Sequence, residues 1–130
     1  MHVVLGFTLA IVFQLAHVVE HTEFEAAGID KIVENEWAIR QVRTTANFAP
    51  SNKFVSWFVG GLNFQIEHHL FPRVSHVHYP ALSRIVKDSC EKHGINYVEF
   101  PTMSQAVASH FRFMRQLGKK PVQAALAAQY

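Results

Sequence analysis

A long uncharged apolar segment opens the sequence and constrains the fold more than any other feature. Residues 3–19 read VVLGFTLAIVFQLAHVV, seventeen residues without a formal charge. As a helix they are about 26 Å long, slightly less than a hydrocarbon core of about 30 Å. A signal peptide needs a positively charged start and a small-residue cleavage site, and the sequence has neither. The apolar character begins abruptly at Met1, so we interpret residues 3–19 as the end of a longer transmembrane helix. A buried helix of a soluble bundle is the alternative.

Composition excludes several classes of protein. Hydrophobic residues make up 49% and charged residues 17% of the chain, a balance that disordered chains do not have. Cys90 is the single cysteine, which excludes a disulfide framework and a Cys-rich zinc module. The net charge of +2, without a basic stripe interleaved with aromatic residues, argues against nucleic-acid binding. Residues 1–36 carry a net charge of −5 and residues 37–130 one of +7, so the C-terminal portion suits a cytosolic face or an acidic partner.

Turn and cap residues divide the rest of the chain into short helices. Residues 36–47 are predicted as a helix, and residues 50–52 as a turn followed by a helix cap. A further helix is predicted over residues 78–93, because Pro80 lies near its first turn and Gly94 lies just past its end.

A last helix is predicted after Thr102. Thr102 and Gln105 form a capping-box pattern that opens it, and Gly118 ends it. We therefore expect residues 78–117 to form cytosolic helices and residues 119–130 a loose tail. The apolar positions of the last helix are expected to pack against a core: Met103, Val107, Phe111 and Met114.

A second apolar stretch precedes a cluster of histidines. Residues 54–64 read FVSWFVGGLNF, which is too short to span a membrane. Trp57 and Phe58 suit the boundary between hydrocarbon and water. We expect residues 54–72 to form an interfacial segment.

Nine histidines are unusual for a chain of this length, and two groups of them stand out. The first is His17-Val18-Val19-Glu20-His21. On a helix the two histidines share one face, so both imidazoles can point at one metal. A lone histidine on an apolar helix more often bonds to a neighbour, but ionisable groups near membrane depth are usually functional. We predict that His17 binds a metal and leave His21 as an uncertain ligand.

The second group is Gln65-Ile66-Glu67-His68-His69. If this segment is helical, Gln65 lies one turn before His68 and His69, so the three side chains lie on one side of the helix. The side chains of the two adjacent histidines point about 100° apart around the helix axis, which suits binding to two adjacent metals better than binding to one. Imidazole accepts zinc, iron, copper or nickel, whereas the lack of thiolates argues against structural zinc or an iron–sulfur cluster.

The other histidines and the cysteine are not predicted as metal ligands. His76 and His78 are expected to be solvated or on the substrate side, with hydrogen bonding to the metal ligands as the alternative, and His93 and His110 are expected to lie at the surface. Cys90 is expected to be a small core residue, since no motif surrounds it.

One alternative concerns His17-x-x-Glu20-His21, which matches the inverted zinc-protease motif, with the glutamate as the base. Against a zinc hydrolase, this motif ends an apolar stretch, the chain shows little strand, and the second histidine group stays unused. A non-catalytic membrane fragment is the third possibility.

The run Leu-Asn-Phe-Gln-Ile-Glu-His-His-Leu-Phe-Pro at residues 62–72 resembles the third histidine box of membrane fatty acid desaturases. The Gln in place of the first His is similar to the front-end branch, which includes the Δ6 and Δ5 acyl desaturases. The resemblance extends from about Phe13 to Pro101. It implies an all-α, multi-pass membrane enzyme with its histidine boxes on the cytosolic side, of which residues 1–118 are the C-terminal part.

The resemblance also implies a site. Family members hold a non-haem di-iron centre with histidines from three boxes and one histidine near the end of a late membrane helix. His17 matches that histidine, and Gln65, His68 and His69 match the third box, so these four are expected metal ligands and the last three are expected catalytic residues. His21 has no counterpart. The first two boxes are absent, so the chain alone is expected to be inactive without the N-terminal part of the enzyme.

The implied reaction belongs to lipid metabolism. It takes two electrons, activates O₂ and removes two hydrogens from adjacent methylenes of an acyl-CoA or acyl-lipid, leaving a double bond. The expected electron donor is a ferredoxin or cytochrome b5 at the cytosolic face, with membrane lipid as a further partner. The residues do not distinguish a desaturase from a related di-iron hydroxylase, and they fix neither the double-bond position nor the acyl carrier.

Overall fold

The computed structural model describes residues 2–20, 22 and 34–118, and these residues are mostly helical, as the sequence predicts. The predicted tail, residues 119–130, lies outside them. In chain order the elements are α1 (His2–His17), α2 (Glu34–Thr44), β1 (Asn47–Phe48), α3 (Lys53–Phe58), α4 (Gln65–Leu70), a 3₁₀ turn η1 (His76–His78), α5 (Tyr79–Lys92), β2 (Glu99–Phe100) and α6 (Met103–Leu117).

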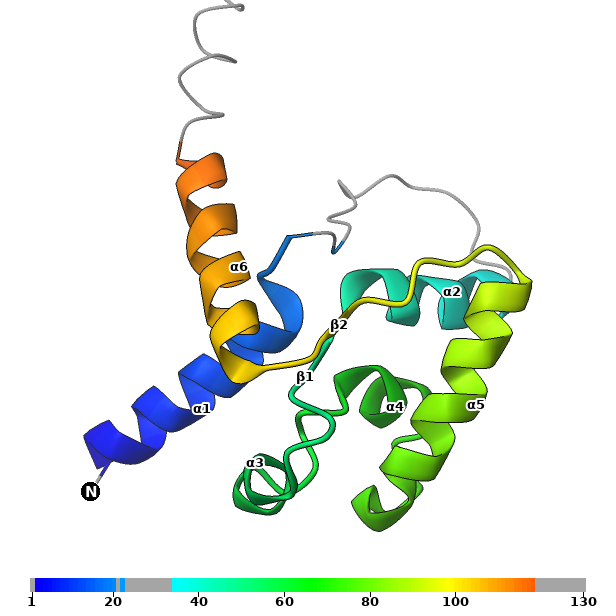
Figure 1. Cartoon of the computed structure of the whole chain (residues 1–130), viewed down its shortest axis with the longest axis horizontal. Helices are drawn as coiled ribbons and strands as arrows, with labels where there is room; N and C mark the ends of the chain where they lie inside the picture. Colours follow the sequence, from blue (N-terminus) through cyan, green and yellow to red (C-terminus); the bar gives the residue numbers. More distant parts are fainter. Residues whose placement is uncertain (1, 21, 23–33, 119–130) are drawn as a thin grey trace, which may run out of the picture.

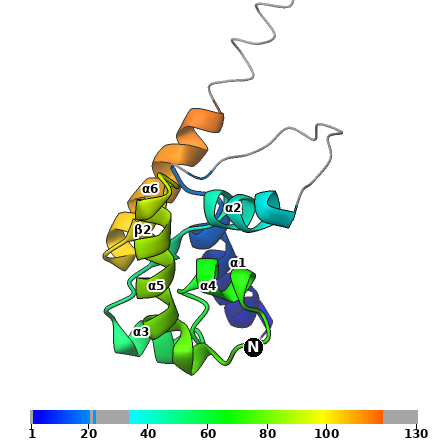
Figure 2. The same cartoon turned by 90° about the vertical axis from the view of Figure 1, so that its right-hand side faces the viewer.

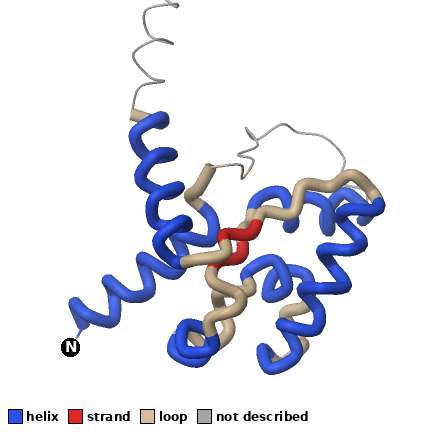
Figure 3. The backbone as a smooth tube through the Cα atoms, in the orientation of Figure 1, coloured by secondary structure: helices blue, strands red, loops and turns tan. Residues whose placement is uncertain are grey.

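The described residues are consistent with the all-α prediction apart from a short two-stranded parallel sheet that lies between the helices (Figure 3). Asn47 pairs with Glu99 and Phe48 with Phe100. The pairing continues at Ala49, whose N–H donates to the Phe100 carbonyl at 2.8 Å. These bonds join the segment that leads from α2 toward the histidine box to the segment that leads into α6.

Helices flank this sheet (Figures 1 and 2). Their apolar side chains form two main clusters. In the first, α1 packs against α6, with Phe48 of β1 fully buried between neighbouring elements. The second lies between α2, α4 and α5, where Ile66 is fully buried and Cys90 is 4% exposed. This cluster confirms Cys90 as a core residue. The box helix α4 is therefore enclosed on the side that faces α2 and α5.

The predicted boundaries of α3, α5 and α6 are confirmed at their caps, whereas the helix predicted over residues 36–47 ends at Thr44 and Asn47 belongs to β1. The Asn52 side chain accepts hydrogen bonds from the N–H groups of the first turn of α3. The Thr102 hydroxyl accepts one from the Gln105 N–H at 3.3 Å at the start of α6. Pro80 lies in the first turn of α5, and Gly94 follows that helix with a φ of 66°. Local chemistry thus defines the ends of these helices.

The predicted packing stripe of α6 is only half correct. Met103 and Val107 pack against the core that α6 shares with α1. Phe111 and Met114 are 69% and 49% exposed. The reason is geometric, because the C-terminal half of α6 extends beyond the end of α1 (Figure 1).

The apolar segment predicted as the end of a transmembrane helix forms α1, sixteen residues long. None of the helices that the structure describes has both the length and the apolar character needed to cross a bilayer. The N-terminal half of α1 nevertheless exposes large apolar side chains: Val3, Val4, Leu5 and Phe7.

Candidate metal centre

The structure brings the two predicted histidine groups together. His17, the last residue of α1, faces His69 of α4, with ring centroids 5.0 Å apart. His68 lies next to His69, at a centroid distance of 5.9 Å and an interplanar angle of 78°. Three predicted ligands from two distant segments therefore converge at one place. The uncertain ligand, His21, lies outside the described residues.

Helix α2 orients two of these rings. The His17 Nδ1 lies 3.4 Å from the Thr44 carbonyl oxygen. A carbonyl only accepts, so Nδ1 carries the hydrogen and, in the neutral ring, the lone pair is on Nε2. The His69 Nδ1 lies 2.9 Å from the Gln41 side-chain Oε1, one turn earlier on the same helix. Metal-binding histidines use their second ring nitrogen in this way, to fix the tautomer and the ring orientation.

The third ring is held from α5. The His68 Nδ1 lies 3.3 Å from the hydroxyl of Tyr79, which is 4% exposed. Burial raises the pKa of that hydroxyl above the usual value for tyrosine. Burial also lowers the pKa of His69, and the neighbouring imidazoles of His17 and His68 lower it further. The neutral imidazole, which is the form that binds metal, is favoured at this position.

Gln65 is the most unusual residue of the site. Its side chain is fully buried, and neither its amide nitrogen nor its amide oxygen has a hydrogen-bond partner within the described part of the chain. An unpartnered buried polar group costs about 1–3 kcal/mol, so such a residue requires an explanation. An additional group at the site that Gln65 binds provides one.

Glu67 lies between the predicted ligands in the sequence, and its carboxylate belongs to a buried network of hydrogen bonds. The Asn47 Nδ2 donates to Glu67 Oε2 at 2.7 Å, and the Tyr97 hydroxyl donates to Oε1 at 3.0 Å. The Asn47 Oδ1 accepts the Ile66 N–H of α4 at 3.0 Å. Burial raises the pKa of Glu67, and the two side-chain hydrogen bonds oppose that rise. Burial and Glu67 together raise the pKa of Tyr97.

Sequence reasoning missed these supporting residues. Nothing in the local sequence marks the four side chains and the one carbonyl group that hold the three imidazoles and Glu67: those of Gln41, Asn47, Tyr79 and Tyr97, and the carbonyl of Thr44. The one available signal was Glu67 itself, a carboxylate inside an apolar run, which requires buried donors.

The zinc-hydrolase alternative is not favoured by this geometry. Helix α1 ends at His17, so the helical spacing on which that interpretation depended does not extend to Glu20. The Glu20 carboxylate accepts hydrogen bonds from Arg112 Nε at 2.8 Å and Gln116 Nε2 at 3.2 Å. Its acceptor atoms are thus used in holding α6.

Of the other histidines, three lie as expected and one does not. His76, His78 and His93 are exposed. His110 was predicted at the surface, and that prediction is wrong. It is half-buried, and its Nδ1 lies 2.7 Å from the Val18 carbonyl oxygen, because α6 folds back onto the end of α1.

The site fits a metal only as part of a larger ligand set. Within the described ranges, no three His, Cys, Asp or Glu side chains lie close enough to hold one ion. Three imidazoles with anchored Nδ1 atoms and one unpartnered buried amide are still nitrogen and oxygen donors that iron accepts. The donor set therefore suits ions whose remaining ligands come from elsewhere.

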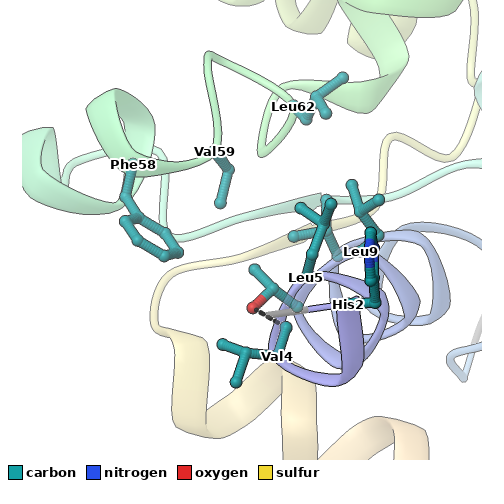
Figure 4. Close-up of a pocket in the computed structure, with 9 residues that line it drawn as sticks. His2, Val4, Leu5, Leu9, Phe58, Val59 and Leu62 are labelled. Atoms are coloured by element: carbon teal, nitrogen blue, oxygen red, sulfur yellow. Dashed lines mark hydrogen bonds between the residues drawn. The ribbon is translucent and has the colours of Figure 1, made fainter.

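An apolar cleft lies apart from these ligands, toward the N-terminus of α1 (Figure 4). It has a volume of about 670 Å³, and none of the candidate ligands lines it. Leu5 and Leu9 of α1 face Phe58, Val59 and Leu62 of the segment that leads to the box.

A comparison with protein families supports the desaturase interpretation. The fatty acid desaturase family matches residues 1–101, most of the chain, and the chain therefore belongs to that family. No solved structure matches it.

The curated proteins to which the chain is similar are named as desaturases as well. The chain is 49% identical to a sn-1 linoleoyl-lipid 6-desaturase of Synechocystis sp. over 88% of the chain and 32% of the relative. It is 45% identical to an acyl-lipid (8-3)-desaturase of Physcomitrium patens over 87% of the chain and 23% of the relative. It is 35% identical to Delta(5) fatty acid desaturase A of Dictyostelium discoideum over 91% of the chain and 26% of the relative. The chain thus spans a third or less of the length of these relatives.

Proposed function

We propose that this chain is the C-terminal part of a front-end fatty acid desaturase and contributes His17, Gln65, His68 and His69 to a non-haem di-iron centre. The observation that carries the proposal is the buried, unpartnered amide of Gln65, one helical turn before His68 and His69 in α4, together with three imidazoles held through their Nδ1 atoms. The family membership supports it. When bound, the iron ions would supply the oxidation in which O₂, two electrons and two protons, together with two hydrogens removed from adjacent methylenes, give a double bond and two molecules of water.

The residues of this chain have separate tasks in that reaction. His17 and His69 present Nε2 from two different helices, and Thr44 and Gln41 fix the rotation of their rings. Gln65 offers either a ligand oxygen or a hydrogen bond to a bound water. Bulk water is excluded from the Gln65 amide, because Gln65 is fully buried and its neighbours along the chain, Phe64 and Ile66, are 2% and 0% exposed. A dry, fixed site protects a strong oxidant from side reactions.

The substrate class that we propose is an acyl chain carried on a membrane lipid. The names of the relatives from Synechocystis and Physcomitrium describe linoleoyl-lipid and acyl-lipid desaturases. An acyl-CoA is the alternative carrier. Comparing lipid-bound and CoA-bound acyl chains as substrates of the complete enzyme tests this choice, and analysing the product for a hydroxyl group distinguishes a hydroxylase.

We also propose a membrane-embedded setting in the complete, multi-pass enzyme. Residues 3–19 would form the end of a transmembrane helix, and residues 54–72 an interfacial segment. In support, Phe54, Trp57 and Phe58 of α3 are 70%, 77% and 60% exposed. Aromatic side chains favour the level of the lipid headgroups. The histidine boxes and residues 78–117 would then lie on the cytosolic side, where a ferredoxin or cytochrome b5 delivers electrons.

The proposal is tested by the iron content of the complete desaturase, purified in detergent. The variants His17→Ala, Gln65→Ala, His68→Ala and His69→Ala are each expected to lose iron and most desaturase activity while expression is maintained. His76→Ala and His78→Ala are matched controls, because both histidines are close to the box in sequence yet exposed. Wild-type iron content in the Gln65 variant would leave Gln65 a structural residue. A wild-type enzyme that binds no iron would overturn the proposal.

A further inference from the structure

Helix α6 lies against the end of α1, the helix that carries His17, although it begins beyond the residues that the family match covers (Figure 1). Part of this contact is apolar. Ala106 is fully buried in the cluster that also contains Leu15 and Ala16 of α1. The polar part of the contact is more specific, and it is concentrated on the residues that follow His17.

Two side chains of α6 bind backbone groups of that segment. His110 Nδ1 lies 2.7 Å from the Val18 carbonyl oxygen, and since a carbonyl only accepts, Nδ1 is the donor. The fully buried Ser109 hydroxyl accepts the Glu20 N–H at 3.0 Å. Both bonds join residues about ninety positions apart in the chain.

Two further side chains of α6 hold the Glu20 carboxylate. Arg112 Nε donates to Oε2 at 2.8 Å, and Gln116 Nε2 donates to Oε1 at 3.2 Å. Ser109, Arg112 and Gln116 are three and four residues apart, so they lie on one face of α6. That face follows the chain as it leaves α1.

The α6 contacts hold backbone groups of the residues that directly follow α1. The last carbonyls of an α-helix have no partner within the helix. In α1 the Ala16 carbonyl accepts the Ala46 N–H at 2.8 Å, and just past the helix the Val19 carbonyl accepts the Thr22 hydroxyl at 2.8 Å. His110 supplies the partner of Val18. The direction in which α1 ends, and with it the place of His17, is therefore set from outside the helix.

We propose that α6 is a positioning element for the metal ligand His17, with His110 and Ser109 as its principal positioning residues. This inference rests on the proposed function. A ligand atom must lie within about 0.2 Å of its required distance from a metal. His17 is the last residue of its helix, where fraying would displace the ring, and the α6 contacts begin one residue later. Their loss should lower the affinity for iron by about tenfold, as residues that orient metal ligands commonly do.

The test compares His110→Ala, His110→Asn and His93→Ala in the complete desaturase. In the His110→Asn variant an amide N–H on Cγ takes the place of Nδ1, so the bond to Val18 can re-form. His93 is the matched control, because its Nδ1 also lies 2.8 Å from a backbone carbonyl near the end of a helix, that of Ser89 in α5. Iron retained after dialysis against a chelator is the readout, with the thermal unfolding midpoint measured in parallel.

We expect His110→Ala to lose iron, His110→Asn to retain most of it, and His93→Ala to behave as the wild type. In a His17→Ala background, His110→Ala should remove no further iron, because its effect acts through that ligand. If His110 had only a structural role, His110→Ala would lower the unfolding midpoint, but its effect on iron would not depend on whether His17 is present. Ser109→Ala serves as a milder variant should His110→Ala fail to accumulate, with the same direction expected.

The outcomes separate this inference from the proposed function. Wild-type iron retention in His110→Ala, or equal losses in His110→Ala and His110→Asn, would overturn the role of α6 even if His17→Ala loses iron. Wild-type iron content in His17→Ala itself would overturn the ligand assignment, and the inference with it.

Discussion

The Glu67 carboxyl group shows how one side chain organises the histidine box. It lies between Gln65 and His68 in the sequence, yet it is directed into the interior, where Asn47 and Tyr97 donate to its two oxygens. Asn47 Nδ2 also donates to the Tyr97 oxygen at 2.7 Å, so the three side chains close a ring of hydrogen bonds. This ring fixes α4 against both chain segments that lead to the sheet.

Replacing Tyr97 with Phe tests this ring. The variant leaves Glu67 Oε1 without its donor in a buried place, and an unsatisfied buried partner costs about 1–3 kcal/mol. We expect a lower thermal unfolding midpoint for the purified complete enzyme and reduced iron retention. The same substitution in a Glu67→Leu background should cost less, because the carboxylate is no longer there. An unchanged midpoint in Tyr97→Phe would show that the ring does not stabilise the box.

At the residue scale, the sequence predicts candidate ligands but not the residues that hold them. His17 and the box are predicted from their apolar surroundings and from the resemblance of an eleven-residue run. The bond from Asn47 to Glu67 spans 20 positions and the one from Tyr97 spans 30, and no periodicity links such positions. His110 was misplaced for the same reason, since its partner Val18 is 92 positions away.

Among the elements, the turn between α3 and α4 is the most constrained. Gly60 and Gly61 have φ values of 61° and 79°, which L side chains rarely adopt. A Cβ on Gly61 would lie 2.6 Å from the Cβ of His76, whereas a Cβ on Gly60 would meet nothing within 4 Å. The loop that follows the box therefore depends on close approach at Gly61.

Gly61→Ala and Gly60→Ala form a matched pair at this turn. Each carries a backbone cost of about 1 kcal/mol for a positive φ. Only Gly61→Ala also forces η1 outward, and overpacking adds about 1–3 kcal/mol. We expect both variants to lower the unfolding midpoint, and Gly61→Ala to lower it clearly more. Only Gly61→Ala should reduce the iron content, because it displaces the neighbouring Tyr79. Equal midpoints for the two would contradict the role of the contact.

Helices were easier to predict than strands here, for a physical reason. The ends of α3, α5 and α6 depend on caps within a few residues, such as Asn52, Gly94 and Thr102, so the local sequence encodes them. The strands have two residues each and pair across 52 positions. Such a pair has no alternation to detect, and tertiary packing decides it.

At the scale of the whole molecule, charge indicates where the proposed electron donor would bind. Residues 37–130 carry a net charge of +7. Arg84 of α5 is exposed, whereas Lys87 lies 3.2 Å from Glu99, which neutralises much of its charge. Of these two cations, Arg84 is therefore the better contact for an acidic protein.

Arg84→Glu is expected to slow reduction of the complete enzyme by reduced ferredoxin and by reduced cytochrome b5, tested separately. Charge steering acts mainly on the association rate and is screened by salt. The difference from wild type should shrink as ionic strength rises. Lys53→Glu in α3, with the same change in charge, is the control and should leave the rate unchanged. Identical rates for Arg84→Glu and wild type at low salt would exclude this docking face.

Part of the apolar surface lies at one end of the molecule. The N-terminus of α1 and the whole of α3 lie at one end of the molecule, and α2 lies at the other (Figures 1 and 2). The cleft between α1 and α3 belongs to the apolar end. Each end carries one tryptophan, Trp57 on α3 and Trp37 on α2, exposed by 77% and 45%. The two residues can therefore report on the two ends independently.

Fluorescence quenching by brominated lipids tests the proposed orientation. Bromine in the acyl chains quenches tryptophans in or near the hydrocarbon, so Trp57 should contribute to the quenched signal and Trp37 should not. In the complete enzyme, reconstituted in bilayers of brominated phosphatidylcholine, Trp57→Phe should reduce the quenched fraction, and Trp37→Phe should raise it by removing an unquenched emitter. The opposite pattern would place α2 in the membrane. Equal effects of the two substitutions would show that α3 is not its interfacial anchor.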